Sequence, residues 1–103
     1  DYIHIYDLAD AHLKALEYLE TYNSSDIFNL GTGSGYSVKE IISTSEKVTD
    51  RYIKTEMAGR RAGDPAVLVA DNSKARSVLK WIPKYNLEEI ISSAWNWHKN
   101  QLY

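Results

Sequence analysis

The stretch DIFNLGTGSGYSVKEII, residues 26–42, decides the fold class because it joins a strand-like run to a helix through three closely spaced glycines. Residues 27–30 have the composition of a short buried strand. Ser37 and Glu40 match a capping box, which predicts a helix that begins at Val38. A strand, a glycine loop and a helix in this order are the layout of a dinucleotide-binding loop, so the stretch predicts either such a loop or a plain strand-to-helix turn.

The spacing of the glycines favours the plain turn. The dinucleotide fingerprint is G-x-G-x-x-G, with an acidic residue about 20 positions later. Gly31, Gly33 and Gly35 instead give G-x-G-x-G, and the acidic candidates Asp50 and Glu56 do not end a convincing second strand. The loop backbone can still approach a ligand closely, and the helix N-terminus behind it favours an anion.

The rest of the chain alternates short strand-like and helical patterns. Asp7 is the expected cap of the first helix, and Asn86 with Glu89 is the expected capping box of the last. We therefore expect one α/β unit, a mixed α+β piece over residues 1–103 with no internal repeat. It would contain about four helices, at residues 8–20, 38–48, 72–79 and 87–99, and about four short strands, at residues 2–6, 27–30, 53–58 and 67–69.

Composition excludes several classes of function. The net charge of −2 and pI near 5.9 give no electrostatic case for binding nucleic acid or a membrane surface. The absence of cysteine excludes a disulfide framework and a Cys-based metal site, and no apolar run is long enough to span a bilayer. We expect a cytoplasmic protein. The start at Asp1 without Met predicts a piece of a longer chain.

A charged loop is the second candidate site. Arg60 and Arg61 precede Gly63 and Asp64, so two guanidinium groups lie beside a breaker and a carboxylate. Arginine donors suit phosphate oxygens, and an aspartate can accept hydrogen bonds from sugar hydroxyls. From spacing alone, however, a solvated turn with a surface ion pair explains the same residues.

No complete catalytic set is evident from the residues. The three histidines have no metal-ligand spacing, no tyrosine is followed four positions later by a lysine, and no serine lies in a nucleophile elbow. We therefore expect no catalytic, cofactor-binding or metal-binding residue in this chain.

Four stretches carry a resemblance to a known family. They are DYIHIYDLADAHLKALEYL (1–19), FNLGTGSGYSVKEII (28–42), GRRAGDPAVLVADNSKARSVLKW (59–81) and LEEIISSAWNWHK (87–99). In this order they resemble the C-terminal substrate-binding segment of UDP-glucose 4-epimerase, also called UDP-galactose 4-epimerase, in the extended short-chain dehydrogenase/reductase superfamily. The resemblance covers essentially the whole chain, and its R-R-x-G-D loop followed by A-D-x-S-K-A is the most specific part.

The resemblance implies a substrate site. Arg61 would bind the diphosphate, Asp64 a ribose hydroxyl, and Val38 would pack near the uracil. The position of Leu68 often carries Tyr near the hexose, and a shorter side chain implies tolerance of UDP-N-acetylhexosamines. The family also uses an arginine immediately before the Asp1-Tyr2 pair, which this sequence lacks.

The resemblance also implies a reaction and its partners. In the family, NAD bound to an N-terminal Rossmann domain takes a hydride while a tyrosine deprotonates the 4-hydroxyl. The 4-keto sugar turns, and the hydride returns to its other face. This chain would position UDP-glucose or UDP-galactose against that domain, would be inactive alone, and could self-associate. Two alternatives remain: the same segment of a nucleotide-sugar dehydratase or decarboxylase, and an interaction module without a ligand.

Overall fold

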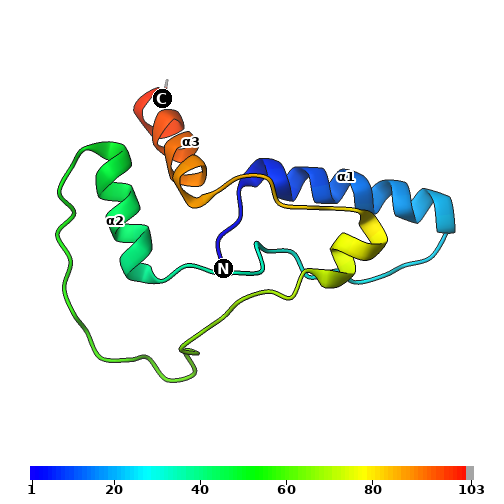
Figure 1. Ribbon diagram of the computed structural model, residues 1–103, viewed down its shortest axis with the longest axis horizontal. Coiled ribbons are helices and arrows are strands. Elements are labelled where there is room, and N and C mark those ends of the chain that lie inside the picture. The colour runs from blue at the N-terminus through cyan, green and yellow to red at the C-terminus, as the bar shows by residue number, and fades with distance from the viewer. Residues whose placement is uncertain (102–103) are drawn as a thin grey trace.

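The chain is an open assembly of helices joined by long extended segments (Figure 1). The computed structural model describes residues 1–101. In that range α1 spans Ile5–Tyr22, α2 spans Val38–Thr49 and α3 spans Leu87–Lys99, while Ala75–Leu79 form the short π-helix η1. Helix α2 packs on α3, and η1 packs on α1. Residues 51–70 form a wide, exposed arc between α2 and the segment that leads to η1.

The predicted strands are wrong. No residue from 1 to 101 belongs to a strand, so the α/β assignment with four short strands does not describe this chain. Residues 27–30, 53–58 and 67–69 lie outside the helices without forming strands, and Ile5 and Tyr6 belong to α1. Alternation and β-branched residues favour an extended backbone, but a strand also needs a neighbour with which to form a hydrogen-bonded ladder. Residues 1–101 supply no such neighbour.

The start of the first helix also differs from the prediction. Helix α1 begins at Ile5 because His4, not Asp7, is its N-cap: the Tyr6 amide donates to His4 Nδ1 at 3.0 Å. Asp7 is 2% exposed. Its carboxylate accepts from the backbone amides of Lys84, at 2.9 and 3.0 Å, and of Tyr85, at 3.1 Å. Asp7 therefore fastens α1 to residues 84–85, which immediately precede α3.

Both predicted capping boxes are confirmed. At α2 the Glu40 amide donates to Ser37 Oγ and the Ser37 amide donates to Glu40 Oε2. At α3 the same reciprocal pair forms between Asn86 and Glu89. These short-range pairs satisfy amides that the first helical turn leaves without partners, which is why the sequence predicts both helix starts.

The buried core is small for a chain of this length. It consists of Ala11, Ala75, Leu79 and Trp81 between α1 and η1, and the Trp81 indole donates to the Asp7 carbonyl at 2.8 Å. The radius of gyration is 16.7 Å, whereas a compact domain of this size has about 13 Å. Large apolar side chains on the outer face of α1, such as Leu13 and Leu16, are more than half exposed.

Candidate functional site

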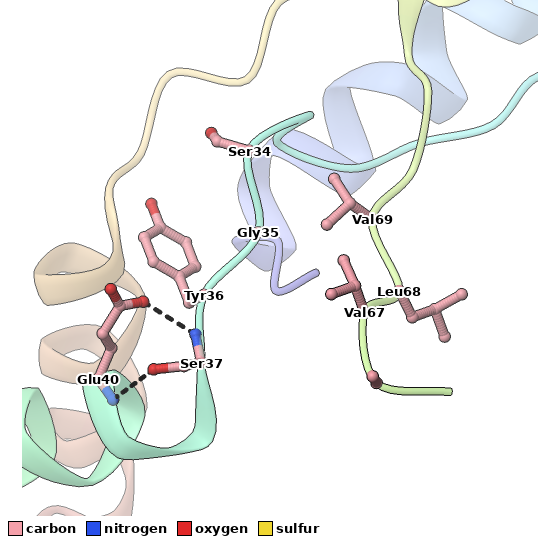
Figure 2. A pocket seen from close by; sticks show the side chains of 9 residues that line it. Ser34, Gly35, Tyr36, Ser37, Glu40, Val67, Leu68 and Val69 are labelled. Atoms are coloured by element: carbon pink, nitrogen blue, oxygen red, sulfur yellow. Dashed lines mark hydrogen bonds between the residues drawn. The ribbon is translucent and has the colours of Figure 1, made fainter. Parts of the chain in front are cut away.

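A cavity of about 340 Å³ lies between the glycine segment and residues 66–69. Ser34, Gly35, Tyr36, Ser37 and Glu40 form one wall, and residues 66–69 form the other. Figure 2 shows the two walls facing each other, with the Val69 side chain directed toward Gly35 and the Leu68 side chain directed away from it. The cavity therefore lies between the glycine loop and the segment that follows the charged loop. These two stretches are far apart in the sequence, and no sequence pattern connects them.

The glycines of the loop allow this close approach of the two walls. A Cβ at Gly31 would lie 2.5 Å from Asp1 Oδ2 and 2.7 Å from the Ala70 Cβ. A Cβ at Gly35 would lie 2.6 Å from the Val69 Cγ2, and Gly35 also has φ +72°. The glycine pattern is thus explained by packing within the chain, and the predicted close approach to a nucleotide remains a prediction.

The Asp1 carboxylate occupies the loop that was expected to attract an anion. Its Oδ1 accepts from the Thr32 amide at 3.0 Å and the Thr32 hydroxyl at 2.8 Å, and its Oδ2 accepts from the Gly33 amide at 3.2 Å. The same Oδ2 accepts from the Ala70 amide, on the opposite wall, at 3.1 Å. An internal carboxylate therefore already satisfies the donors that a phosphate would need.

A buried asparagine, Asn72, bonds to the glycine segment at residue 31. Asn72 is 6% exposed, and its Nδ2 donates to the Gly31 carbonyl at 2.8 Å. Its Oδ1 accepts from Arg76 Nε at 2.9 Å. This amide is satisfied on both sides, so it holds the glycine segment near η1 and offers no free polar atom to a ligand.

These residues do not fit the pyrophosphate of a dinucleotide. The negative charge of Asp1 lies among the loop amides, and a second carboxylate, that of Glu40, caps the first turn of α2. Both charges would repel a phosphate where the fingerprint requires one to bind. The geometry agrees with the glycine spacing in favouring a turn.

Arg61 and Asp64 lie on the exposed arc, outside the residues that line the cavity. Arg61 Nη2 donates to Asp64 Oδ2 at 3.3 Å, and the two side chains are 85% and 48% exposed. The Arg60 guanidinium donates to the Asp64 carbonyl at 3.4 Å. The structure thus brings Arg61 and Asp64 together, as a surface ion pair of the kind that contributes little stability.

The other two predicted residues flank the cavity. Val38 is the first residue of α2, next to the lining residue Ser37, and is 68% exposed. Leu68 lines the cavity through the segment 66–69 and is 73% exposed. Arg61, Asp64, Val38 and Leu68 are therefore all open to solvent, and only Leu68 is a wall residue.

A serine–histidine pair between α1 and α3 resembles part of a hydrolase site but cannot act as one. His4 Nε2 lies 2.9 Å from Ser93 Oγ, and His4 is 3% exposed. His4 Nδ1 accepts the Tyr6 amide, so in the neutral ring the proton is on Nε2. The imidazole then donates to Ser93 and cannot remove its proton.

A charged cluster joins the end of α1 to η1. Lys74 donates to Asp26 Oδ1 and to the Ile27 carbonyl, and the Tyr18 hydroxyl donates to Asp26 Oδ2 at 3.2 Å. The hydrogen bond from Lys74 lowers the pKa of Asp26, while desolvation, followed by the hydrogen bond to Asp26, raises the pKa of Tyr18. This cluster holds residues 26 and 27 against Lys74, and each of its side chains already has a partner.

Metal and membrane sites find no support in the described part of the chain. Residues 1–101 bring no three His, Cys, Asp or Glu side chains together in a way that could hold a metal ion. No helix in that range combines the length and the apolar character that crossing a bilayer requires.

Similarity to known proteins covers nearly the entire chain. The family model described as GDP-mannose 4,6 dehydratase matches residues 1–94. A UDP-glucose 4-epimerase of Rhizobium leguminosarum bv. trifolii is 55% identical over 98 residues, which are 95% of this chain and 30% of that protein. The chain thus spans about 30% of the length of the curated relatives it matches.

Two solved structures share the fold. A UDP-glucose 4-epimerase from Stenotrophomonas maltophila, solved with NAD and formylated UDP-arabinopyranose, has a TM-score of 0.91 and 39% identity over 96% of this chain and 30% of its own. The UDP-Glc/GlcNAc 4-epimerase of Campylobacter jejuni has a TM-score of 0.86 and 50% identity over 98% of this chain and 31% of its own. The resemblance to UDP-glucose 4-epimerases is confirmed, and the chain belongs to the family described as GDP-mannose 4,6 dehydratase.

Proposed function

We propose that this chain is the C-terminal, UDP-sugar-binding segment of a UDP-hexose 4-epimerase. The observation that carries the proposal is the identity of 43–55% to curated UDP-glucose 4-epimerases over nearly the whole chain. Its role is to hold the nucleotide while C4 of the hexose is inverted. Binding energy from a part of the substrate that does not react contributes to rate when it fixes the reacting part.

In this proposal Arg61 binds the diphosphate and Asp64 a ribose hydroxyl. Their mutual ion pair is exposed and long, at 3.3 Å, so exchanging it for a ligand costs little. The planar guanidinium of Arg61 can then donate two hydrogen bonds to phosphate oxygens. Val38 would pack near the uracil and Leu68 near the hexose, on either side of the cavity between the two walls.

NAD, in this proposal, is bound by a Rossmann domain outside this chain. The NAD-bound relative supports the cofactor, and the internal carboxylate among the loop amides argues against NAD at residues 31–35. NAD would accept and return the hydride. The residues of this chain hold the nucleotide, and we expect the isolated chain to have no epimerase activity and to be cytoplasmic.

Calorimetric titration of UDP into the wild-type chain and into Arg61→Ala tests the diphosphate site. We expect wild-type binding and a loss of affinity on the order of tenfold or more in Arg61→Ala, as for a charge-assisted hydrogen bond. Arg51→Ala is the matched control, because Arg51 stacks on Trp95, with 5.4 Å between its Cζ and the ring centroid, and does not belong to the charged loop. Equal UDP affinity in wild type and Arg61→Ala would contradict the assignment.

Leu68 is the residue through which we propose that N-acetylhexosamines are tolerated. The C. jejuni relative, which is a UDP-Glc/GlcNAc 4-epimerase and 50% identical, supports this extension. Leu68→Tyr should weaken binding of UDP-N-acetylglucosamine more than binding of UDP-glucose, because the larger ring fills the space of the acetyl group. Rejection of UDP-N-acetylglucosamine by the wild-type chain would refute this idea while leaving the UDP site intact.

A further inference from the structure

The two walls of the cavity are not joined by a ladder. Among the residues described, no backbone–backbone hydrogen bond connects residues 31–37 with residues 66–70. Extended segments side by side are ordinarily fixed by such bonds. Some other interaction must therefore determine how far apart the walls lie.

Asp1 provides that interaction. Its carboxylate accepts from Thr32 and Gly33 on the glycine side and from Ala70 on the other side, all within 3.2 Å. Its backbone nitrogen also donates to the Leu68 carbonyl at 2.9 Å. Three of these groups are backbone N–H donors, one on Oδ1 and two on Oδ2, so an acceptor with two oxygens satisfies all of them.

We propose that Asp1 is a positioning residue for the cavity: its ionised carboxylate sets the separation of the two walls and thereby the fit of the sugar nucleotide. The nature of the ligand rests on the function proposed above, whereas the wall separation does not. Asp1 acts away from the core, because the core depends on Asp7 and Trp81, which share no hydrogen bond with it.

Asp1→Asn tests the wall separation directly. The amide is nearly isosteric, but whichever way it turns, its NH₂ group faces at least one backbone N–H: those of Gly33 and Ala70 in one orientation, or that of Thr32 in the other. In NMR spectra we expect loss of the contact between Gly35 Hα and the Val69 methyls. We also expect amide exchange to become faster on the order of tenfold where an acceptor is lost: at Gly33 and Ala70 if the NH₂ group replaces Oδ2, or at Thr32 if it replaces Oδ1. Exchange at Lys84 and Tyr85, which Asp7 protects, should not change.

Two further variants keep this test decisive. Asp10→Asn makes the same chemical change in a partly exposed pair with Lys14 and should leave Gly33 and Ala70 unaffected. Thr32→Val removes the hydroxyl that donates to Asp1 Oδ1 and accepts from the Gly35 amide, so it should accelerate exchange at Gly35 and, by a smaller factor, at Gly33 and Ala70. Unchanged exchange at all three of Thr32, Gly33 and Ala70 in Asp1→Asn, or a simultaneous loss of protection at Lys84 and Tyr85, would overturn the positioning role.

The ligand readout separates positioning from general stability. Asp1→Asn should reduce affinity for UDP-glucose on the order of tenfold more than affinity for UDP, because Arg61 lies outside the two walls. Equal losses for both ligands would overturn the effect on fit. If the wild-type chain bound neither ligand, the proposed function would fail, and amide exchange alone would still decide whether Asp1 holds the walls.

Discussion

The region around Trp81 and the arc of residues 51–70 are built in opposite ways. Trp81 is 0% exposed and its indole has a partner, whereas Met57 on the arc is 90% exposed. Within residues 1–101 every buried side-chain nitrogen or oxygen is hydrogen-bonded. The arc carries Arg61 and Asp64, whose side chains are paired only with each other. The comparison shows that buried, hydrogen-bonded side chains around Trp81 hold the helices together, a region called the frame below. The proposed ligand-binding residues remain exposed to solvent.

Trp81→Ala should break the fixed region with the largest effect. It removes the only large side chain that is fully buried among residues 1–101, together with a hydrogen bond to the Asp7 carbonyl. We expect a loss of about 3–5 kcal/mol in the free energy of unfolding, measured by urea denaturation. Trp97→Ala, at a residue that is 59% exposed, is the control and should cost far less. Equal losses would show that the frame does not depend on this core.

Asp7→Asn should have the next largest effect. Three contacts within 3.1 Å bind its carboxylate to the Lys84 and Tyr85 amides. An NH₂ group in place of one oxygen leaves a buried donor unsatisfied, which costs about 1–3 kcal/mol. Asp10→Asn, at the partly exposed i,i+4 pair with Lys14, should cost less, about 0.5 kcal/mol. Denaturation of both variants measures the difference, and similar values would contradict the role of Asp7.

Acid should weaken the contact between Asp26 and Lys74. Lys74 lowers the pKa of Asp26 below its ordinary value of 3.8. A carboxyl group with a lowered pKa in the folded state contributes stability above its unfolded pKa and loses it as the pH falls through the folded value. Stability measured from about pH 5 to about pH 2 should therefore fall less steeply in Asp26→Asn than in wild type. Lys74→Met should flatten the curve similarly, and an unchanged slope in both variants would disprove the linkage.

Arg61→Ala should have the smallest effect on stability and thereby sharpen the comparison. The side chain is 85% exposed, so the free energy of unfolding should change by less than about 0.5 kcal/mol. The same variant is expected to lose UDP affinity. Thermal denaturation and UDP titration of one protein sample measure both quantities, and a large loss of stability would place Arg61 in the frame instead.

The sequence predicts those features that contacts between residues close in the chain determine, above all the starts of two helices. The boxes Ser37–Glu40 and Asn86–Glu89 join residues three apart, and both helix starts were correct. The strands were wrong because pairing depends on a partner that the pattern cannot reveal. The sequence does not predict His4 as a cap, because histidine is not one of the usual N-cap residues. It predicts Asp7 instead, because the residues that Asp7 bonds lie 77 and 78 positions away and no local pattern reveals them.

The candidate site was predicted only in part. The glycine stretch forms one wall of the cavity, but the sequence reveals neither its partner wall nor the role of the Asp1 carboxylate. Asp1 bonds to residues 31, 32 and 69 positions away, a separation that no spacing rule covers. Val38 and Leu68 follow from the family resemblance alone, whereas Arg61 and Asp64 also follow from the chemistry of the charged loop. The roles of all four stay predictions because their side chains are exposed and no ligand contact tests them.

The arc of residues 51–70 is a place where the chain could be cut without separating its two halves. Helices α1 and α2 precede it and η1 and α3 follow it, yet α1 packs on η1 and α2 packs on α3. Both helix pairings therefore cross the arc, so the two halves of the chain are held together by more than the peptide bonds between them. A protease that cuts after the exposed Arg60 or Arg61 should yield two pieces that remain associated. The same two pieces, produced separately, should reassemble when mixed.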